Sequence, residues 1–290
     1  MRHGILRRDE TFRAIASEGQ ERAHIFTRAV YQVVPILAMV FVDRPCLSQS
    51  PRSASTSART QSSIRPEPSV RAEPGEIYDR EMSVKIDLKK ICPSYRAKRG
   101  VVDIIEVPTM RYLTVTGHGD PNMEQGYQEA VEALYTVAYK IKFASKRELE
   151  RDYVVPPLEG LWWADDMDAF TGRLDKSQWT WTMMILVPEW VSDSMVAHVI
   201  AAVGESKTPP PRLMDVNLDR LDEGLCVQTL HVGSFDDEGP VLDAIHHDVI
   251  PRHGLIMTGK HHEIYLSDPR RTAPERLSTI LRQPVAHALS

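Results

Sequence analysis

The segments PPLEGLWWAD (156–165) and KHHEIYLSDP (260–269) each place one glutamate inside an apolar or aromatic run that is typical of a β-strand. The two acids are Glu159 and Glu263. Each run follows a helix-like stretch, which itself follows a strand that ends at glycine. Those earlier strands end in TVTGHGDPN (114–122) and TLHVGSFDDEG (229–239). Because a buried carboxylate is costly unless a cation, a donor or a ligand meets it, the repetition predicts a pocket with two acidic walls.

The same alternation of elements extends over the rest of the chain. The expected strands cover residues 101–117 (with a turn at Pro108), 153–163, 178–187, 225–232, 262–266 and 283–288. The expected helices cover residues 123–144 (capped by Asn122), 188–205, 210–221, 239–252 and 275–281. The order strand–helix–strand–strand occurs twice, which favours an α+β fold of duplicated βαββ repeats. Such repeats tend to close two sheets around a pseudo-twofold axis, with a ligand groove between the halves.

Side-chain alternation along the two acidic strands predicts what faces this groove. Residues two apart in a strand share a face. The resulting sets are Glu159, Leu161 and Trp163 in one strand and Glu263, Tyr265 and Ser267 in the other. If the repeats are symmetric, both glutamates face the groove with an aromatic ring beside each. Trp162 points away from Trp163, and Trp179 and Trp181 share one face and are expected in the core.

Composition excludes several classes of protein. The formal net charge is −5, so the chain lacks the basic surface of a nucleic-acid-binding protein. Hydrophobic residues make up 42% and charged residues 26%, which is typical of a globular domain. Cys46, Cys92 and Cys226 lie far apart without C-x-x-C spacing, which argues against a disulfide scaffold and favours a reducing, cytoplasmic location.

The first part of the chain differs from the rest. Residues 1–81 contain arginine but no lysine, and residues 48–75 are rich in Ser, Arg and Pro, which predicts a largely disordered extension. The apolar segment 29–42 is shorter than the ~20 residues that span a bilayer, and its flanks do not match a signal peptide, so a membrane anchor is disfavoured. Met82 opens a stretch of ordinary composition, so residues 82–290 are expected to form the domain.

The sequence offers no familiar frame for metal or nucleotide chemistry. His246/His247 and His261/His262 are neighbours that point apart, and no H-E-x-x-H pattern occurs, so no metal is expected. A nucleophile elbow and a P-loop are also missing, and no cofactor is predicted. The acids at 236–238 precede a helix and are interpreted as charge that favours its N-terminus.

These residues resemble the GyrI-like small-molecule-binding family, whose duplicated fold is also the effector domain of multidrug-sensing regulators. The resemblance is carried by YLTVTGHGDPN (112–122), YVVPPLEGLWWAD (153–165), TLHVGSFDDEGPVLDAIH (229–246) and HHEIYLSDPRRTAPERLSTILRQPV (261–285). It extends over residues 83–290 and excludes residues 1–81. No helix-turn-helix segment precedes the domain, so the regulator architecture is not expected.

The resemblance implies a function and a set of residues. Glu263 matches the family's acidic residue that contacts cationic aromatic ligands, and Glu159 with Trp162 and Trp163 resembles a subgroup that hydrolyses cyclopropane-bearing DNA-alkylating compounds. Glu159 and Glu263 are therefore the expected catalytic pair. The expected ligand-binding residues are Trp162, Trp163, Tyr112 and Tyr265. A drug-binding or sensing module without turnover and a gyrase-protecting partner remain as alternatives, and the oligomeric state is left open.

Overall fold

The computed structural model describes residues 85–121, 123, 125–164 and 176–288. Its strands are β1 (Asp103–Val107), β2 (Met110–His118), β3 (Leu158–Trp163), β4 (Thr180–Leu186), β5 (Asn217–Leu221), β6 (Gly224–Val232), β7 (Leu255–Met257), β8 (His261–Tyr265) and β9 (Ser278–His287). Its α-helices are α2 (Leu88–Ile91), α3 (Gln125–Glu148), α5 (Asp193–Gly204), α6 (Gly239–Ala244) and α7 (Ile250–Arg252). Short 3-10 turns include Pro93–Tyr95, Leu213–Asp215 and Pro274–Arg276, and a π-helical segment, Ile245–Val249, joins α6 to α7.

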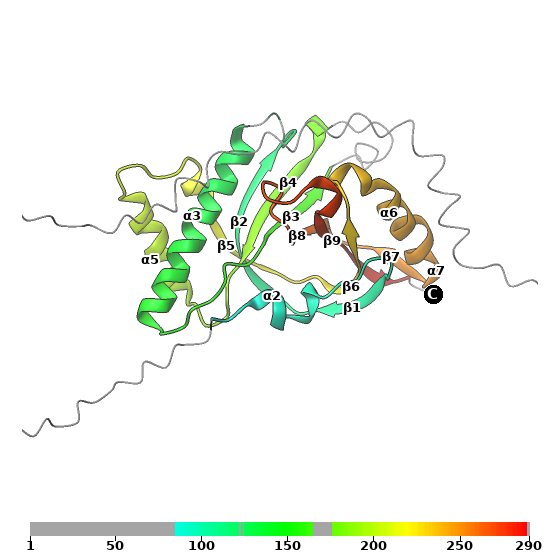
Figure 1. Cartoon of the computed structure of the whole chain (residues 1–290), viewed down its shortest axis with the longest axis horizontal. Coiled ribbons are helices and arrows are strands. Elements are labelled where there is room, and N and C mark those ends of the chain that lie inside the picture. The colour runs from blue at the N-terminus through cyan, green and yellow to red at the C-terminus, as the bar shows by residue number, and fades with distance from the viewer. Residues whose placement is uncertain (1–84, 122, 124, 165–175, 289–290) are drawn as a thin grey trace, which may run out of the picture.

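All strands belong to one continuous antiparallel arrangement in the order β1-β6-β9-β8-β3-β4-β2-β5, with β7 added on β9. The unit β2-α3-β3-β4 forms one half, and β6-α6/α7-β8-β9 forms the other, as Figure 1 shows. The halves meet where β3 pairs with β8. Strand β1, which precedes the first half, pairs with β6 of the second half, and β5, which precedes the second half, pairs with β2 of the first. The duplicated βαββ fold is thus confirmed, but the two sheets expected from the sequence are joined into one.

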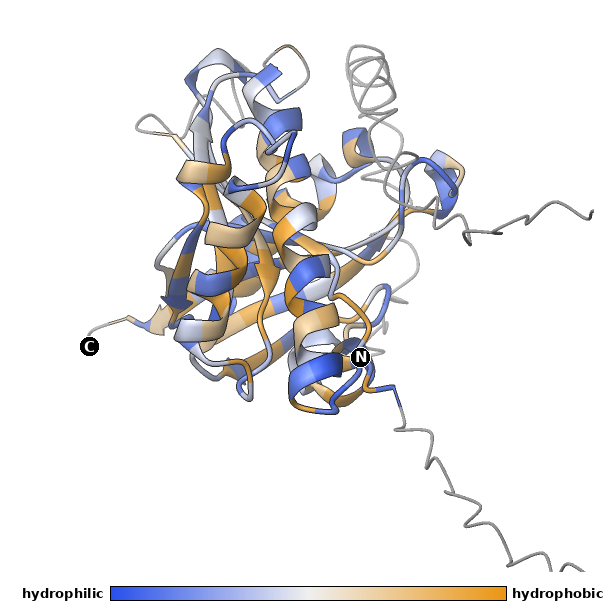
Figure 2. Ribbon diagram, turned by 90° about the vertical axis from the view of Figure 1, so that its left-hand side faces the viewer, coloured by the Kyte–Doolittle hydropathy of each residue, from blue (hydrophilic) through white to orange (hydrophobic). Residues whose placement is uncertain are grey.

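The sheet has two differently covered faces. On what we call the helix face, α3 and α6–α7 pack on the strands and α5 packs on α3, around a core that includes Leu113, Leu134 and Met183. On the N-terminal face, the segment before β1, which includes α2 and the 3-10 turn Pro93–Tyr95, covers the strands, and Leu88 and Tyr95 pack against Met184. Hydrophilic and hydrophobic residues alternate along the helices in Figure 2, as expected of helices buried on one side only.

Helix α3 forms as its apolar spacing predicts. Its buried side chains recur at three or four residues and include Leu134, Ala138 and Ile141, whereas Tyr127 and Val131 are partly buried. Lys146 and Arg147 stand in the last turn, where positive charge stabilises the helix dipole. The helix begins two residues later and ends four residues later than expected. The proposed cap Asn122 lies outside the described residues.

Two expected helices are wrong. Residues 210–221 contain only a 3-10 turn and then the edge strand β5, in which Leu218 and Leu221 are the more buried residues. Residues 275–281 pass from a 3-10 turn directly into β9, whose central residues are buried on both faces. The sequence of a strand covered on both sides is a continuous apolar run, and the spacing of its apolar residues does not distinguish it from a buried helix.

Other boundaries moved, and β7 was missed. Strand β3 begins at Leu158 rather than residue 153, because Pro156 and Pro157 precede it, and Tyr153 makes only an isolated bridge with Ile86. The expected extension 1–81, its apolar segment and its linker lie outside the described residues. None of the helices in the described segments is both long enough and apolar enough to cross a membrane.

Candidate functional site

The two glutamates predicted to share a groove lie on opposite faces of the sheet. In the pairing of β3 with β8, Glu159 stands opposite Ile264, and Glu263 stands opposite Gly160. Paired residues share a face in an antiparallel sheet, and successive residues alternate between faces. The two sequence motifs are therefore offset by one residue, and a one-residue offset exchanges the faces. The expectation that both acids face one groove is wrong for this reason.

The aromatic candidates divide in the same way. Tyr112 and Trp163 belong with Glu159 to the N-terminal face, whereas Trp162 and Tyr265 belong with Glu263 to the helix face. Trp163 is covered by Lys260, whose Nζ lies 3.1 Å from the centre of the ring. Of the pair expected in the core, Trp181 is fully buried on the helix face, and Trp179 is partly buried against the same core.

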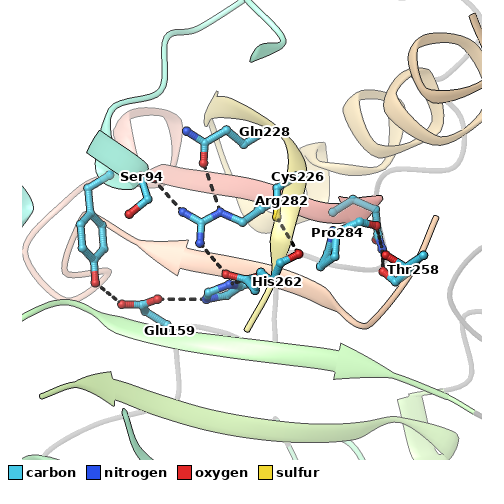
Figure 3. A network of polar contacts seen from close by, with 11 residues as sticks. Ser94, Glu159, Cys226, Gln228, Thr258, His262, Arg282 and Pro284 are labelled. Carbon is cyan, nitrogen blue, oxygen red and sulfur yellow. Dashed lines mark hydrogen bonds and ion pairs between the residues drawn. The ribbon is translucent and has the colours of Figure 1, made fainter. Parts of the chain in front are cut away.

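On the N-terminal face, Glu159 belongs to a closed chain of buried polar groups (Figure 3). Tyr95 OH donates a hydrogen bond to Glu159, and His262 Nε2 lies 2.9 Å from Glu159 Oε2. The other ring nitrogen of His262 lies 2.9 Å from Glu223 Oε1, and Arg282 donates to Glu223 Oε2 at 2.8 Å. Glu159 is 0% exposed, and both of its carboxylate oxygens are paired with protein groups, which leaves neither free for a bound molecule.

Arg282 links this chain to the covering segment and to β6. It donates to the backbone carbonyl of Ser94 at 2.7 Å and to Gln228 Oε1 at 3.1 Å, as Figure 3 shows. Two acids, one imidazole and one guanidinium therefore alternate in a buried, fully partnered network. Such an arrangement offsets the desolvation of its charges only when every member is paired.

The charges of this network fix its protonation. Burial alone would lower the pKa of His262, but the charge of Glu223 and hydrogen bonds to Glu159 and Glu223 raise it to about 9. Burial would raise the pKa of Glu223, but His262 and then Arg282 lower it to about 2. At neutral pH, His262 is therefore an imidazolium between two carboxylates. A charged histidine held between two carboxylates stabilises the fold and is not free to act as an acid or a base.

On the helix face, Glu263 has a different environment. Its side chain is 15% exposed, and Tyr265 OH donates to its Oε2 at 2.8 Å. Tyr265 in turn accepts a hydrogen bond from Trp162 Nε1 at 3.1 Å. These two rings meet above Gly160, where an added Cβ would lie only 2.9 Å from Trp162 Nε1 and 3.1 Å from Tyr265 OH. The glycine is thus required by the close approach of the two side chains.

Further aromatic rings surround this pair. Tyr127 stacks on Trp162 with ring centres 6.5 Å apart, and Trp179 meets Trp162 edge-on at 5.8 Å. Phe235 meets Tyr265 edge-on at 5.7 Å. A carboxylate framed by aromatic rings is suited to a flat or cationic ligand, because rings stack on it and their faces attract positive charge.

A second acid on this face was missed. Glu238 is 4% exposed and hydrogen-bonds Thr279, which stands directly across from Tyr265 in the sheet. Burial and then the charge of Glu263 raise the pKa of Glu238 well above its ordinary value. The sequence pattern predicts one common role, charge at a helix start, for all three acids 236–238. Only its contact with Thr279 of β9 separates Glu238 from its neighbours, and no sequence signal marks that contact.

Two histidines lie close to this acidic pair. His261 precedes Glu263 by two residues on the same face, and its Nε2 lies 3.6 Å from Glu263 Oε1. The π-helical segment places the ring of His246 6.2 Å from that of His261. Burial and then the neighbouring imidazoles of His261 and His247 lower the pKa of His246 to about 4. At neutral pH, His246 is therefore uncharged.

These groups do not form a metal centre. Across residues 85–288, apart from 122, 124 and 165–175, no three His, Cys, Asp or Glu side chains are grouped so that they would hold a metal ion. The helix face instead combines the partly exposed carboxylate of Glu263, the buried acid Glu238 whose pKa is raised, and aromatic rings.

Comparisons with known proteins agree with the fold. The model of the GyrI-like small molecule binding domain matches residues 101–286. An uncharacterized conserved protein from Listeria innocua is 41% identical, with 70% of this chain and 100% of that chain covered and a TM-score of 0.62. A protein from Listeria innocua described as a hydrolase is 39% identical with the same coverage and a TM-score of 0.59. The comparison with curated proteins found no match.

Proposed function

The chain belongs to the GyrI-like small-molecule-binding family, and from this premise we propose that it binds planar hydrophobic or cationic molecules on the helix face, around Glu263. The observation that carries the proposal is the partly exposed carboxylate of Glu263, held by Tyr265 beside the ring of Trp162. The carboxylate attracts a positive charge, and the rings stack on the flat body of the ligand.

The proposal assigns different roles to the two faces. Glu263, Trp162 and Tyr265 contact the ligand. Glu159 and Tyr112 are buried on the other face, and Trp163 is covered by Lys260, so we assign these three residues to the support of the sheet. Glu159 therefore acts on the ligand only through the position of β3.

Calorimetry with a cationic aromatic dye and a neutral analogue of the same shape tests this binding. Glu263→Gln keeps the shape of the side chain and removes its charge. It is expected to weaken binding of the cationic dye by about 1–3 kcal/mol, the range for hydrogen bonds to charged groups, and binding of the neutral analogue by less. Glu205→Gln removes a charge from an exposed position at the end of α5 and serves as the control. Equal losses for both ligands would contradict the role of the Glu263 charge.

A second function, hydrolysis, is favoured by the relative from Listeria innocua that is described as a hydrolase. We propose as the substrate class DNA-alkylating compounds whose cyclopropane is conjugated to a dienone. Glu263 would take a proton from a water molecule while the oxygen of that water bonds to the ring carbon. The ring carbon–carbon bond then breaks, and its electron pair moves to the carbonyl, which takes up a proton.

Mass analysis of such a compound after incubation with the protein distinguishes the two functions. A product heavier by one water molecule supports hydrolysis, and Glu263→Gln is then expected to lower turnover by about 10²–10⁴-fold, the usual share of general acid–base catalysis. Release of the compound unchanged would identify a binding or sensing module. Protection of gyrase without ligand binding would support the partner-protein alternative.

A further inference from the structure

Polar atoms beside Glu263 are buried without hydrogen-bond partners. They are Oε1 of Glu238 and both ring nitrogens of His261, and none of the residues that the structure describes hydrogen-bonds them. By contrast, every charged member of the network around Glu159 is paired. A buried polar atom left without a partner is destabilising, so a bound group that pairs with these atoms removes that cost.

The unpaired atoms of His261 lie on the same strand as Glu263, and that of Glu238 comes from outside the strand. His261 and Tyr265 stand two residues before and after Glu263 on the same face. Glu238 hydrogen-bonds Thr279, the partner of Tyr265 in β9, and lies close enough to Tyr265 and Glu263 to interact electrostatically with them. The polar groups therefore surround one carboxylate, next to the aromatic rings proposed to stack on the ligand.

We propose that Glu238 and His261 form a polar subsite beside Glu263 that hydrogen-bonds the carbonyl or carboxamide group of an aromatic ligand. The subsite rests on the proposed binding function and narrows its ligand class. A ligand without such a group uses Glu263 and the rings but leaves the buried atoms unpaired.

The protonation of these groups fits a carbonyl. Burial and the charge of Glu263 raise the pKa of Glu238 well above its ordinary value, which favours the protonated carboxyl group, a hydrogen-bond donor. His261 donates through one ring nitrogen and accepts through the other. A carboxamide satisfies both, because its oxygen accepts and its nitrogen donates.

The test compares two cationic probes, 1-methylquinolinium and its 3-carboxamide, which share charge and ring system. With the full chain, calorimetry is expected to show that the carboxamide binds about five- to tenfold more tightly, the equivalent of roughly one net hydrogen bond. Glu238→Gln retains a donor and should keep this preference. Glu238→Met removes the donor and should abolish the preference while the affinity for 1-methylquinolinium stays unchanged.

The outcomes separate the subsite from the binding function. Equal affinities of the two probes for the wild type, or a preference that survives Glu238→Met, would overturn the subsite while binding of 1-methylquinolinium still supports the proposed function. Failure of both probes to bind would overturn both proposals. The melting temperature of each variant shows whether a lost preference for the carboxamide reflects lost structure. Binding by Glu238→Gln and an unchanged affinity for 1-methylquinolinium test the same point.

Discussion

Glu159 and Glu263 lie on the two central strands of the sheet, yet they have opposite surroundings. Glu159 on the N-terminal face is sealed and bonded to Tyr95 and His262. Glu263 on the helix face is partly exposed, and polar atoms around it have no partner among the described residues. The difference follows from one position of strand register, since Glu159 pairs with Ile264 and Glu263 with Gly160.

The same residue type therefore serves stability on one face of the sheet and is the candidate for function on the other. A saturated ionic network resists change, because removal of one member leaves its partner charged and buried. A partly satisfied cluster is less stable than an apolar one unless something binds to it. Saturation, rather than burial or charge alone, therefore distinguishes the structural acid from the candidate ligand-binding acid.

The largest expected effect comes from one substitution made on each face. Glu159→Gln leaves the imidazolium of His262 with one fewer anion and should lower the free energy of unfolding by about 3–5 kcal/mol. Glu263→Gln makes the same chemical change at a partly exposed site, where a hydrogen bond from Tyr265 survives, and should change it by less than about 1 kcal/mol. Urea denaturation of both variants measures the contrast.

Equal stability losses in the two variants would contradict the proposed difference between the faces. The faces would then not differ in saturation, and Glu263 would be as structural as Glu159. A stable Glu159→Gln that has lost ligand binding would move the functional site to the N-terminal face.

Alkaline pH should weaken the N-terminal face. The pKa of His262 is about 9 in the folded protein against an ordinary 6.5, so its contribution is complete below 6.5 and disappears as the pH rises through 9. The loss amounts to roughly 3 kcal/mol at full deprotonation, since each pKa unit corresponds to about 1.4 kcal/mol. Denaturation curves between pH 6 and 10, with NMR titration of His262, measure it.

Glu159→Gln provides the control for this pH dependence. It removes one of the hydrogen bonds that raise the pKa of His262, so the loss of stability should begin at lower pH. A wild-type stability that stays constant to pH 10 would show that His262 is neutral in the folded state.

Sequence periodicity predicted most elements, because α3 and the central strands carry clear spacings of apolar residues. It failed where a strand is buried on both faces. Leu277, Ile280 and Leu281 are spaced as on a helix, yet β9 begins at Ser278. It failed also at residues 217–221, whose role as an edge strand depends on pairing with β2.

The candidate site was harder to predict than the fold. Glu263, Tyr265 and Trp162 were identified as candidates and lie together, but their separation from Glu159 depends on register, which no local pattern reveals. The partners of Glu159 lie 64 and 103 residues away along the chain. Such contacts, like the approach of Glu238 to Glu263, arise only when the whole sheet and its covering segments are assembled.

Gly160→Ala sharpens the comparison at the point where the faces meet. The added methyl group would stand 2.9 Å from Trp162 Nε1 and 3.1 Å from Tyr265 OH and force the two side chains apart. A stability loss of about 1–3 kcal/mol is expected from the overpacking, together with weaker ligand binding. The pKa of His262, on the other face, should not change in NMR titration. A variant that binds ligand like the wild type would show that the contact between Trp162 and Tyr265 is not needed.

The smallest effect is expected from removal of residues 1–81. A chain that begins at Met82 retains Leu88, Ser94 and Tyr95, so every group that seals Glu159 is present. Residues 48–75 contain too few apolar side chains to offset the entropy of ordering them. The melting temperature should therefore stay within a few degrees of the full chain. A chain that begins at Val101 lacks Tyr95 and the Ser94 carbonyl, exposes the network and should melt far lower. If the chain that begins at Met82 were equally destabilised, residues 1–81 would belong to the folded domain, and the boundary at Met82 would be wrong.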